Sequence, residues 1–451
     1  MLEAFIVASR AEMSAWIRNL AGAMLVVATL TACSTDGGGD GTGEGAGTRT
    51  PDAELPRALT RSEEAVVGAS LRFGFELAAR TAKSEHRANI VLSPLGASMA
   101  LGIAMNGAGG ETFDAMREAL GFGTLSRAEI NGGYRELIDL LAERDPNVRL
   151  ELANAVWADE EVPFQQAFLQ AVTAAFDARV ESMDFAEPSA VTRINDWVKQ
   201  STDGMIDGIV DTLDPSLVML LTNAVLFDGA WTTSFDPDET RRAAFQREDG
   251  STVEVDMMSL RNVELPRGGD ASYSAVELPY GDGAFAMVIV LPQPGTSARE
   301  FLANLDADRW AEIVGTLTPG RIDLLSLPKL TLTFDTYLND TLIAMGMEPA
   351  FTPGADFTLL SPLGRQMCID FVRQKARVEI DERGTRAAAA TSVGIGLVSF
   401  NGFVVDRPFI FAIRERFSGT VLFVGLVGDP TAADAGAQPL VSACTGAVLT
   451  Q

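Results

Sequence analysis

The sequence predicts an α+β fold, with helices concentrated in the first half of the chain and strands in the second. Between Ser62 and Arg80, apolar residues recur at three- and four-residue spacing, which is typical of an amphipathic helix. Further along, short apolar runs bounded by polar turns follow one another without regular βαβ units or internal repeats. We therefore expect helices packed on a large, mainly antiparallel central sheet, with further sheets beside it.

The remaining elements follow in chain order. A second helix is expected to begin at Ser93-Pro94, because proline is well tolerated at the first helical position. Apolar runs predict buried strands at residues 150–157, 218–227 and 284–291. Residues 324–334 alternate leucine with serine, lysine and threonine, which predicts one half-buried strand. Two final strands are expected within residues 409–427, separated by a turn at residues 417–420.

The composition excludes nucleic-acid binding and argues against a basic membrane surface. The chain has 451 residues, of which 47% are hydrophobic and 21% charged, so it can form a large core. Its formal net charge of −26 repels phosphate backbones. The same acidic balance gives no polybasic patch for a membrane or for heparin. We therefore expect no nucleic-acid partner.

The histidine and cysteine counts limit the available chemistry. His86 is the sole histidine, and its charged neighbours predict an exposed loop. A Ser-His or Cys-His hydrolase would have to use this residue as its base. One histidine and three scattered cysteines (Cys33, Cys368 and Cys444) cannot assemble a His/Cys zinc site. We therefore expect no metal, no cofactor and no enzymatic activity, although these counts leave a carboxylate-only enzyme open.

The N-terminus carries the features of an export signal. Arg10 and Arg18 precede a short apolar run, residues 20–30, which ends in Leu-Thr-Ala-Cys at residues 30–33. A positive flank, a short apolar core and small residues before the cut describe a secretory signal. Leu-Thr-Ala-Cys resembles the lipobox of bacterial lipoproteins, in which the cysteine is diacylated and becomes the mature N-terminus. The alternative is ordinary cleavage after a small residue, with Cys33 incidental.

A glycine-rich segment follows the cysteine, and its composition is that of a flexible tether. The chain therefore divides into a signal peptide with lipobox (1–32), a tether (33–58), a globular domain (59–434) and a C-terminal extension (435–451). The resemblance to lipoproteins implies lipidation of Cys33 and anchoring to the cell envelope, at the outer membrane or cell surface, because Ser34 follows the cysteine. Without lipidation, the exported protein would be secreted.

Fragments spread over the globular domain resemble the serpin family of protease inhibitors, and they occur in the family's order. They are Asn89–Leu95, Leu152–Trp157, Ile194–Trp197, Asn223–Trp231 and Phe403–Phe411. The resemblance implies the serpin fold with an exposed reactive loop. It also implies a monomer that acts as a suicide inhibitor. A serine protease cuts the loop, remains attached as an acyl-enzyme, and is trapped when the loop inserts into the central sheet.

The segment after Val378 looks like the serpin hinge, whose residues would be Glu382, Gly384, Thr385, Ala387, Ala388, Ala389, Ala390 and Thr391. A strand that enters a sheet must present small side chains to the close-packed interior. With Thr385 inward, the inward set is small and uncharged, and Arg386 falls on the solvent face. Four consecutive alanines also favour a helix, but Gly394 and Gly396 would keep any helix short.

The reactive bond has two possible positions. Counting forward from the hinge places it at Val398-Ser399, whereas counting back from residues 407–409 places it at Leu397-Val398. Either position offers an aliphatic side chain to the primary pocket of the protease. The implied targets are elastase-like, subtilisin-like or chymotrypsin-like serine proteases, and a cysteine protease is an alternative.

The resemblance assigns gating of the central sheet to Ser93, Asn223, Trp231 and Gln374. Gln374 stands where many serpins carry a histidine that bonds the asparagine matched here by Asn223. An amide can make a similar bond, so we expect altered gating rather than its loss. Cys368 and Cys444 could pair in an oxidising compartment, or both could stay as free thiols.

Three other functions compete with inhibition. A non-inhibitory serpin would keep the fold and serve as a binding module. A secreted hydrolase would need His86 close to a nucleophile such as Ser93. A structural envelope lipoprotein would interact with no protease at all.

Overall fold

The computed structural model describes residues 54–215, 217–384, 401–432, 436, 440–441 and 448–449. All of these belong to one unit of the chain, residues 49–451. Several residues singled out by the sequence lie outside the described residues: Cys33, Thr385, Ala387, Ala388, Ala389, Ala390, Thr391, Leu397, Val398, Ser399 and Cys444.

Helices cluster in the first half of the described chain, as expected. They are α1 (Arg61–Ser84), α2 (Pro94–Gly107), α3 (Gly110–Ala119), α4 (Arg127–Ala142), α5 (Gln166–Phe176), α6 (Pro188–Ser201), α7 (Ala298–Ala303), α8 (Ala307–Gly315) and α9 (Asn339–Leu342). The predicted second helix is confirmed as α2, which Ser93 caps by accepting a hydrogen bond from the Gly96 N–H. None of the helices described is long and apolar enough to cross a membrane.

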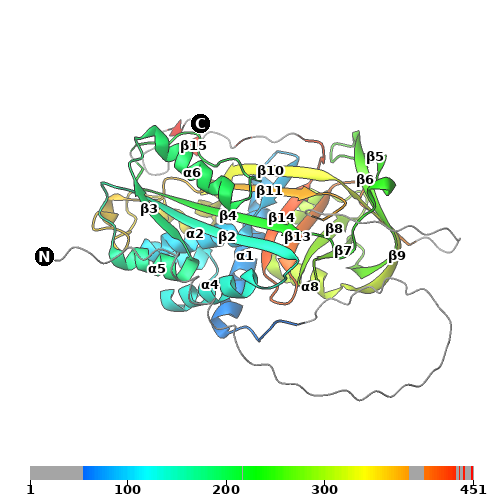
Figure 1. Ribbon diagram of the computed structural model, residues 1–451, viewed down its shortest axis with the longest axis horizontal. Coiled ribbons are helices and arrows are strands. Elements are labelled where there is room, and N and C mark those ends of the chain that lie inside the picture. The colour runs from blue at the N-terminus through cyan, green and yellow to red at the C-terminus, as the bar shows by residue number, and fades with distance from the viewer. Residues whose placement is uncertain are drawn as a thin grey trace, which may run out of the picture. The chain divides into compact units, whose positions relative to one another are not determined.

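The largest sheet has nine strands, in the order β1-β14-β13-β8-β7-β6-β9-β12 with β5 paired to β6 (Figure 1). Its strands are β1 (Asn89–Leu92), β5 (Arg241–Gln246), β6 (Thr252–Gly269), β7 (Tyr273–Tyr280), β8 (Phe285–Pro292), β9 (Thr318–Pro328), β12 (Gly402–Val404), β13 (Phe409–Glu415) and β14 (Val421–Val427). Strands β8, β13 and β14 are buried along almost their whole length and form the centre of the main core. The predicted pair within residues 409–427 is therefore confirmed.

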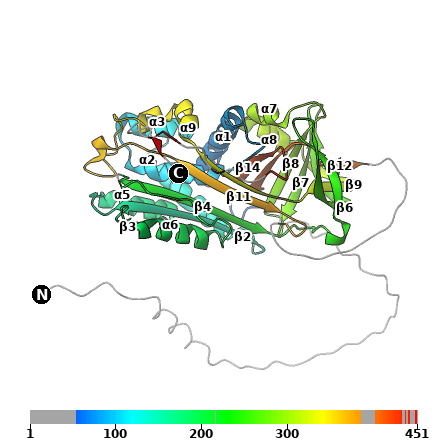
Figure 2. The same ribbon diagram turned by 90° about the horizontal axis from the view of Figure 1, so that it is seen from above.

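Two smaller sheets matter most for the site. One holds β3 (Arg179–Met183), β2 (Val148–Asp159) and β4 (Met219–Gly229), in that order. The other pairs β10 (Leu330–Tyr337) with β11 (Arg373–Ile380). In Figure 2, α6 covers one face of β2 and β4 while α2 lies on the other. Near the C-terminus, β15 (Leu440–Val441) pairs with β16 (Val448–Leu449).

The single strand predicted over residues 324–334 is wrong, because the structure divides it between two sheets. Residues 318–328 form β9 in the large sheet, and residues 330–337 form β10 beside β11. The chain crosses between the sheets at Lys329, whose N–H donates to the carbonyl of Asp256. Residues 325–328 are all buried, whereas residues 330–334 alternate, so only the β10 part has the predicted half-buried pattern.

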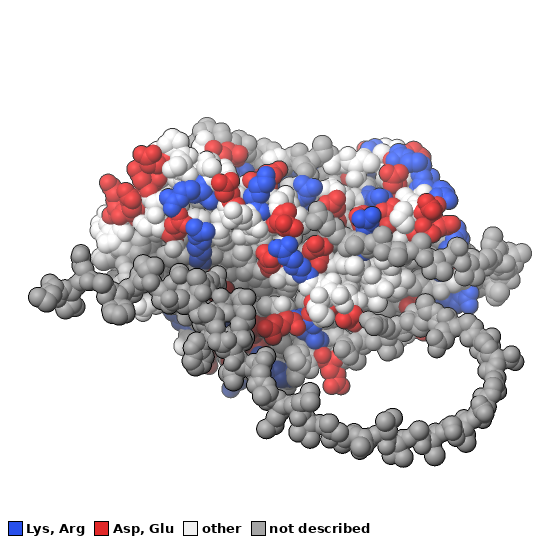
Figure 3. Space-filling view, viewed as in Figure 1, with Lys and Arg blue, Asp and Glu red and all other residues white. Residues whose placement is uncertain are grey.

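Charged side chains on the face shown in Figure 3 are interspersed, with acidic groups beside basic ones. Many are paired, as Arg309 is with Asp270 at 2.6 Å. Acidic residues are therefore not concentrated in one region of that face, and no continuous row of basic residues crosses it.

Candidate functional site

The site lies between β4 and β11, which run in the same direction but belong to different sheets. At one end, Asn223 of β4 and Gln374 of β11 both contact the start of α2. At the other end, Ala230 and Gly384 form an isolated β-bridge. Both strands therefore run from α2 toward that bridge. Since β4 pairs only with β2 and β11 only with β10 among the described strands, each has one edge without a ladder facing the other.

Backbone hydrogen bonds join the segments that follow the two strands at the bridge end. The N–H of Trp231 donates to the carbonyl of Arg383 at 3.0 Å, and the N–H of Phe235 donates to Glu382 at 2.8 Å. Trp231, which is 4% exposed, stacks on Tyr280 with ring centroids 4.3 Å apart. Its indole Nε1 donates to the carbonyl of Asp381 at 3.0 Å. Trp231 thus fixes the end of β11 by an aromatic stack and a buried hydrogen bond.

Glu382, which is buried, is held beside this junction by an ion pair with the partly exposed Lys329. Its carboxylate, with the residue 6% exposed, lies 2.7 Å from Lys329 Nζ and accepts a 2.7 Å bond from Thr240. Burial alone would raise the pKa of Glu382, but the hydrogen bonds from Lys329 and Thr240 bring it below its ordinary value. Glu382 therefore stays charged and anchors the chain where β11 ends.

Gly384 occupies a backbone conformation that other residues rarely adopt. Its φ is +120°, and a Cβ built there would lie 2.4 Å from both the Gly229 carbonyl oxygen and the Trp231 nitrogen. Only glycine fits such a close approach between two backbones. This position lets the chain leave β11 and change direction at the bridge.

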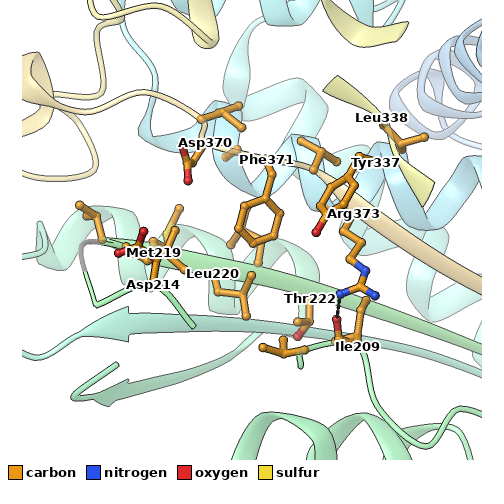
Figure 4. A pocket seen from close by; sticks show the side chains of 18 of the residues that line it. Ile209, Asp214, Met219, Leu220, Thr222, Tyr337, Leu338, Asp370, Phe371 and Arg373 are labelled. Atoms are coloured by element: carbon orange, nitrogen blue, oxygen red, sulfur yellow. Dashed lines mark hydrogen bonds between the residues drawn. The ribbon is translucent and has the colours of Figure 1, made fainter. Parts of the chain in front are cut away.

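Away from the bridge, the space between β4 and β11 opens into a pocket of about 540 Å³. Residues 209–223 line one wall and residues 366–374 the other, with α2 contributing residues 96–104. Figure 4 shows Phe371 and Leu220 facing each other across it. Most of the lining side chains are aliphatic or aromatic, so the pocket is an apolar slot between two unpaired strand edges.

Hydrogen bonds from β11 cross the slot to the segment that leads from α6 into β4. Arg373 donates to the Ile209 carbonyl at 2.8 Å, and its guanidinium also pairs with Asp335. Lys375 donates to the Gly208 carbonyl at 3.0 Å. These bonds hold β11 to that crossing segment rather than to β4 itself.

The predicted bond between Gln374 and Asn223 is absent, which corrects that expectation. Gln374 instead bonds the backbone of Ser93, accepting from its N–H at 3.1 Å and donating to its carbonyl at 2.8 Å. The side chain of Asn223 donates to Asn154 Oδ1 at 2.9 Å. The physical reason is the separation of β4 and β11, which leaves each amide to bond on its own side. Ser93, Asn223 and Gln374 nonetheless meet at the start of α2.

The other predicted site residues form a second group at the opposite end, where Trp231, Glu382 and Gly384 come together. Sequence reasoning missed Asn154, Gly96, Thr240 and Lys329. A Cβ at Gly96 would lie 2.2 Å from Asn223 Oδ1, so that glycine makes room for the amide. Asn154, Thr240 and Lys329 come from segments distant from the residues they contact, and nothing in local sequence spacing identifies them.

The structure does not assemble the alternative hydrolase site. Ser93 is 4% exposed, and its hydroxyl serves as the cap of α2. His86 lies exposed in a loop, as predicted, and among the described residues its side chain has no hydrogen-bond partner. No group of three or more metal-ligating side chains occurs in the part of the chain that the structure describes.

Cys368, on the wall of the slot, is disulfide-bonded. The sequence contains two other cysteines, Cys33 and Cys444, and both lie outside the described residues.

Comparisons with known proteins agree with this geometry. The family model described as "Serpin (serine protease inhibitor)" matches residues 68–430. The chain is 32% identical to Serpin A3-3 of Bos taurus over 80% of this chain and 88% of that protein. It is 30% identical to neuroserpin of Gallus gallus over 76% of this chain and 87% of that protein.

Solved structures show the same fold. The thermophilic serpin Tengpin, in its native state, superposes with a TM-score of 0.74 at 30% identity, covering 84% of this chain and 97% of that one. Human thyroxine-binding globulin complexed with its ligand gives a TM-score of 0.75 at 28% identity, covering 82% of this chain and 100% of that one.

Proposed function

This chain belongs to the serpin family, and we propose that it is a suicide inhibitor of serine proteases. In this proposal, a target protease cuts the segment after Gly384, and the cut segment inserts between β4 and β11. The observation that carries the proposal is the parallel course of these two separated strands, which end together at the Ala230–Gly384 bridge.

The strand directions favour insertion of the residues that follow Gly384. A chain that turns back at Gly384 runs antiparallel to β11, and a tight turn is enough for that connection. The same chain would also run antiparallel to β4, because β4 and β11 share one direction. One new strand could therefore pair with both unpaired edges and join the two small sheets into one.

The sequence of the hinge is suited to such a strand. Residues 385, 387, 389 and 391 are Thr, Ala, Ala and Thr, which are small enough to face α2 in a close-packed interior. Arg386 belongs to the alternate set of side chains, which would face solvent. Insertion of the strand would therefore bury no charged side chain.

The chemistry belongs to the protease, and this chain supplies no catalytic residue. The target's nucleophilic oxygen attacks the carbonyl of the reactive residue and forms an ester, while the peptide nitrogen leaves with a proton. Insertion then carries the attached protease away from the loop's original position. Because deacylation needs a well-ordered oxyanion hole and triad, distortion of the protease stalls the reaction at the ester.

The remaining features of the proposal rest on the sequence. An aliphatic residue at the reactive position, Val398 or Leu397, favours elastase-like, subtilisin-like or chymotrypsin-like targets. We propose that the inhibitor is a monomer. We further propose that it is exported and anchored to the cell envelope through lipid on Cys33.

Incubation with pancreatic-type elastase and, separately, trypsin tests the function. Denaturing gels are examined for a covalent adduct, and mass spectrometry locates the cut. An adduct with elastase and a released peptide that begins at Ser399 or Val398 supports the proposal. Clean cleavage by several aliphatic-preferring proteases without any adduct would instead favour the non-inhibitory alternative, a ligand-binding role of the kind named for thyroxine-binding globulin.

A further inference from the structure

The disulfide at Cys368 places a covalent attachment on the wall of the slot between β4 and β11. Cys368 lines the pocket within residues 366–374, the segment that leads directly into β11. A chain tied to this residue is held beside the apolar lining. The identity of that chain therefore decides what has access to the slot.

Only Cys33 and Cys444 can be the partner within this chain. A cysteine whose sulfur carries a lipid thioether cannot also form a disulfide. If Cys33 is lipidated as proposed, Cys444 remains. We propose that Cys368 pairs with Cys444 and that the C-terminal segment, residues 433–451, is the resident occupant of the slot.

The composition of this segment fits an apolar slot. After Asp434 it contains no charged side chain, although the whole chain carries a net charge of −26. Burying residues 435–451 would therefore desolvate no ionised side chain. The short strands β15 and β16 flank Cys444 in sequence and consist of Leu440, Val441, Val448 and Leu449.

The tether would make the segment a competitor of strand insertion, a consequence that rests on the proposed function. An attached segment acts at an effective concentration in the millimolar range, so even weak binding keeps the slot filled. Reduction of the disulfide would lower that concentration and open the slot. The thiol–disulfide state would then regulate how readily the cut loop inserts.

Disulfide mapping of the full-length protein is the first test and needs no protease. Non-reducing digestion and mass spectrometry should yield one peptide pair that links Cys368 to Cys444. A pair that contains Cys33, or an unpaired Cys368, overturns the proposal.

Hydrogen exchange is the second test. Amides of residues 209–213 and 219–223, which line the slot, should exchange about tenfold faster in Cys444→Ser than in the wild-type protein, because the tether is lost. Cys368→Ser should give the same increase, whereas Cys33→Ser is the matched control and should give none. Reduction of the wild-type protein should reproduce the effect of Cys444→Ser.

Two results would contradict occupancy of the slot. One is unchanged exchange in both variants despite a mapped Cys368–Cys444 bond. The other is protection that depends on protein concentration, since this would identify a second copy as the occupant. A protein that passes both tests yet forms no adduct with any protease refutes the proposed inhibition and leaves the tether intact.

Discussion

The side chain of Gln374 makes two hydrogen bonds with the backbone of Ser93, at 3.1 Å to its nitrogen and 2.8 Å to its carbonyl oxygen. This pair connects β11 to the start of α2 at the edge of the slot. No equivalent bond joins Gln374 to β4, whose Asn223 is bonded to Asn154. The position of β11 therefore depends on α2 more than on its neighbour across the slot.

Removing the Gln374 amide should loosen β11. Gln374→Ala deletes two half-buried hydrogen bonds and leaves the Ser93 N–H without that partner, which predicts a loss of about 1–3 kcal/mol in the free energy of unfolding. Thermal and denaturant unfolding measure the effect. Glu379→Ala, an exposed position on the same strand, is the control and should change stability by less than about 0.5 kcal/mol. Equal stability of the two variants would show that the Ser93 bonds contribute nothing.

Gly96 should be intolerant of any side chain as long as Asn223 keeps its place. Gly96→Ala would put a Cβ 2.2 Å from Asn223 Oδ1, so the amide must move and its bond to Asn154 is strained or lost. The variant is expected to be less stable by about 1–3 kcal/mol. In an Asn223→Ala background, the same change should cost much less, because the clash is gone. A double-mutant cycle by chemical denaturation tests this coupling, and additive effects would disprove it.

Replacement of the hinge glycine Gly384 by a larger residue should strongly destabilise the fold. Gly384→Ala combines a φ of +120° with contacts of 2.4 Å to two backbone atoms, so the bridge to Ala230 must open. We expect a loss of at least about 2 kcal/mol and a lower unfolding temperature. Gly354→Ala is the matched control, because its Cβ would meet nothing closer than 3.9 Å. A wild-type melting curve for Gly384→Ala would contradict the assigned geometry.

Glu382 should make stability depend on pH in the acidic range. Its pKa is lowered in the folded protein, because the hydrogen bonds from Lys329 and Thr240 outweigh the effect of burial. The charged form therefore stabilises the fold above the ordinary pKa of 4.5, and this contribution is lost as pH falls through the lowered folded value. Since the Lys329 side chain is 38% exposed, we expect only about 1 kcal/mol.

The measurement compares the unfolding temperatures of wild-type and Glu382→Gln proteins from pH 7 down to pH 3. The glutamine variant should be less stable at neutral pH, and the difference should shrink below the ordinary pKa. Glu379→Gln, whose side chain is exposed, serves as the control. A gap that is independent of pH would mean that packing, not charge, is the role of Glu382.

The register of the reactive bond can be read from a change in specificity. Arginine at the primary position should convert an aliphatic-selective inhibitor into a trypsin inhibitor. Val398→Arg should do so if the bond is Val398-Ser399, and Leu397→Arg should do so if it is Leu397-Val398. Adducts on denaturing gels, together with the mass of the released peptide, distinguish the two. Failure of both variants to form an adduct with trypsin, while elastase adducts persist, would place the bond elsewhere.

The sequence by itself determined the fold class, the two leading helices and the family, whereas the hinge residues remain predictions. These features depend on local periodicity, capping and ordered fragments, which survive without knowledge of contacts. Through the resemblance it also assigned gating of the sheet to Ser93, Asn223, Trp231 and Gln374. The structure brings Ser93, Asn223 and Gln374 to the start of α2 and places Trp231 at the bridge end. The export signal, the Cys33 anchor and the domain boundaries remain predictions from the sequence.

Only the tertiary structure decided how these residues bond. It turned Gln374 toward Ser93, divided residues 318–337 between two sheets, and paired Glu382 with Lys329, which is 53 positions earlier in the numbering. Whether Gln374 bonds Ser93 or Asn223 depends on the distance between β4 and β11. Packing across the whole core sets that distance. Periodicity along the chain records which face of a strand is buried, but it does not record which neighbour lies against that face.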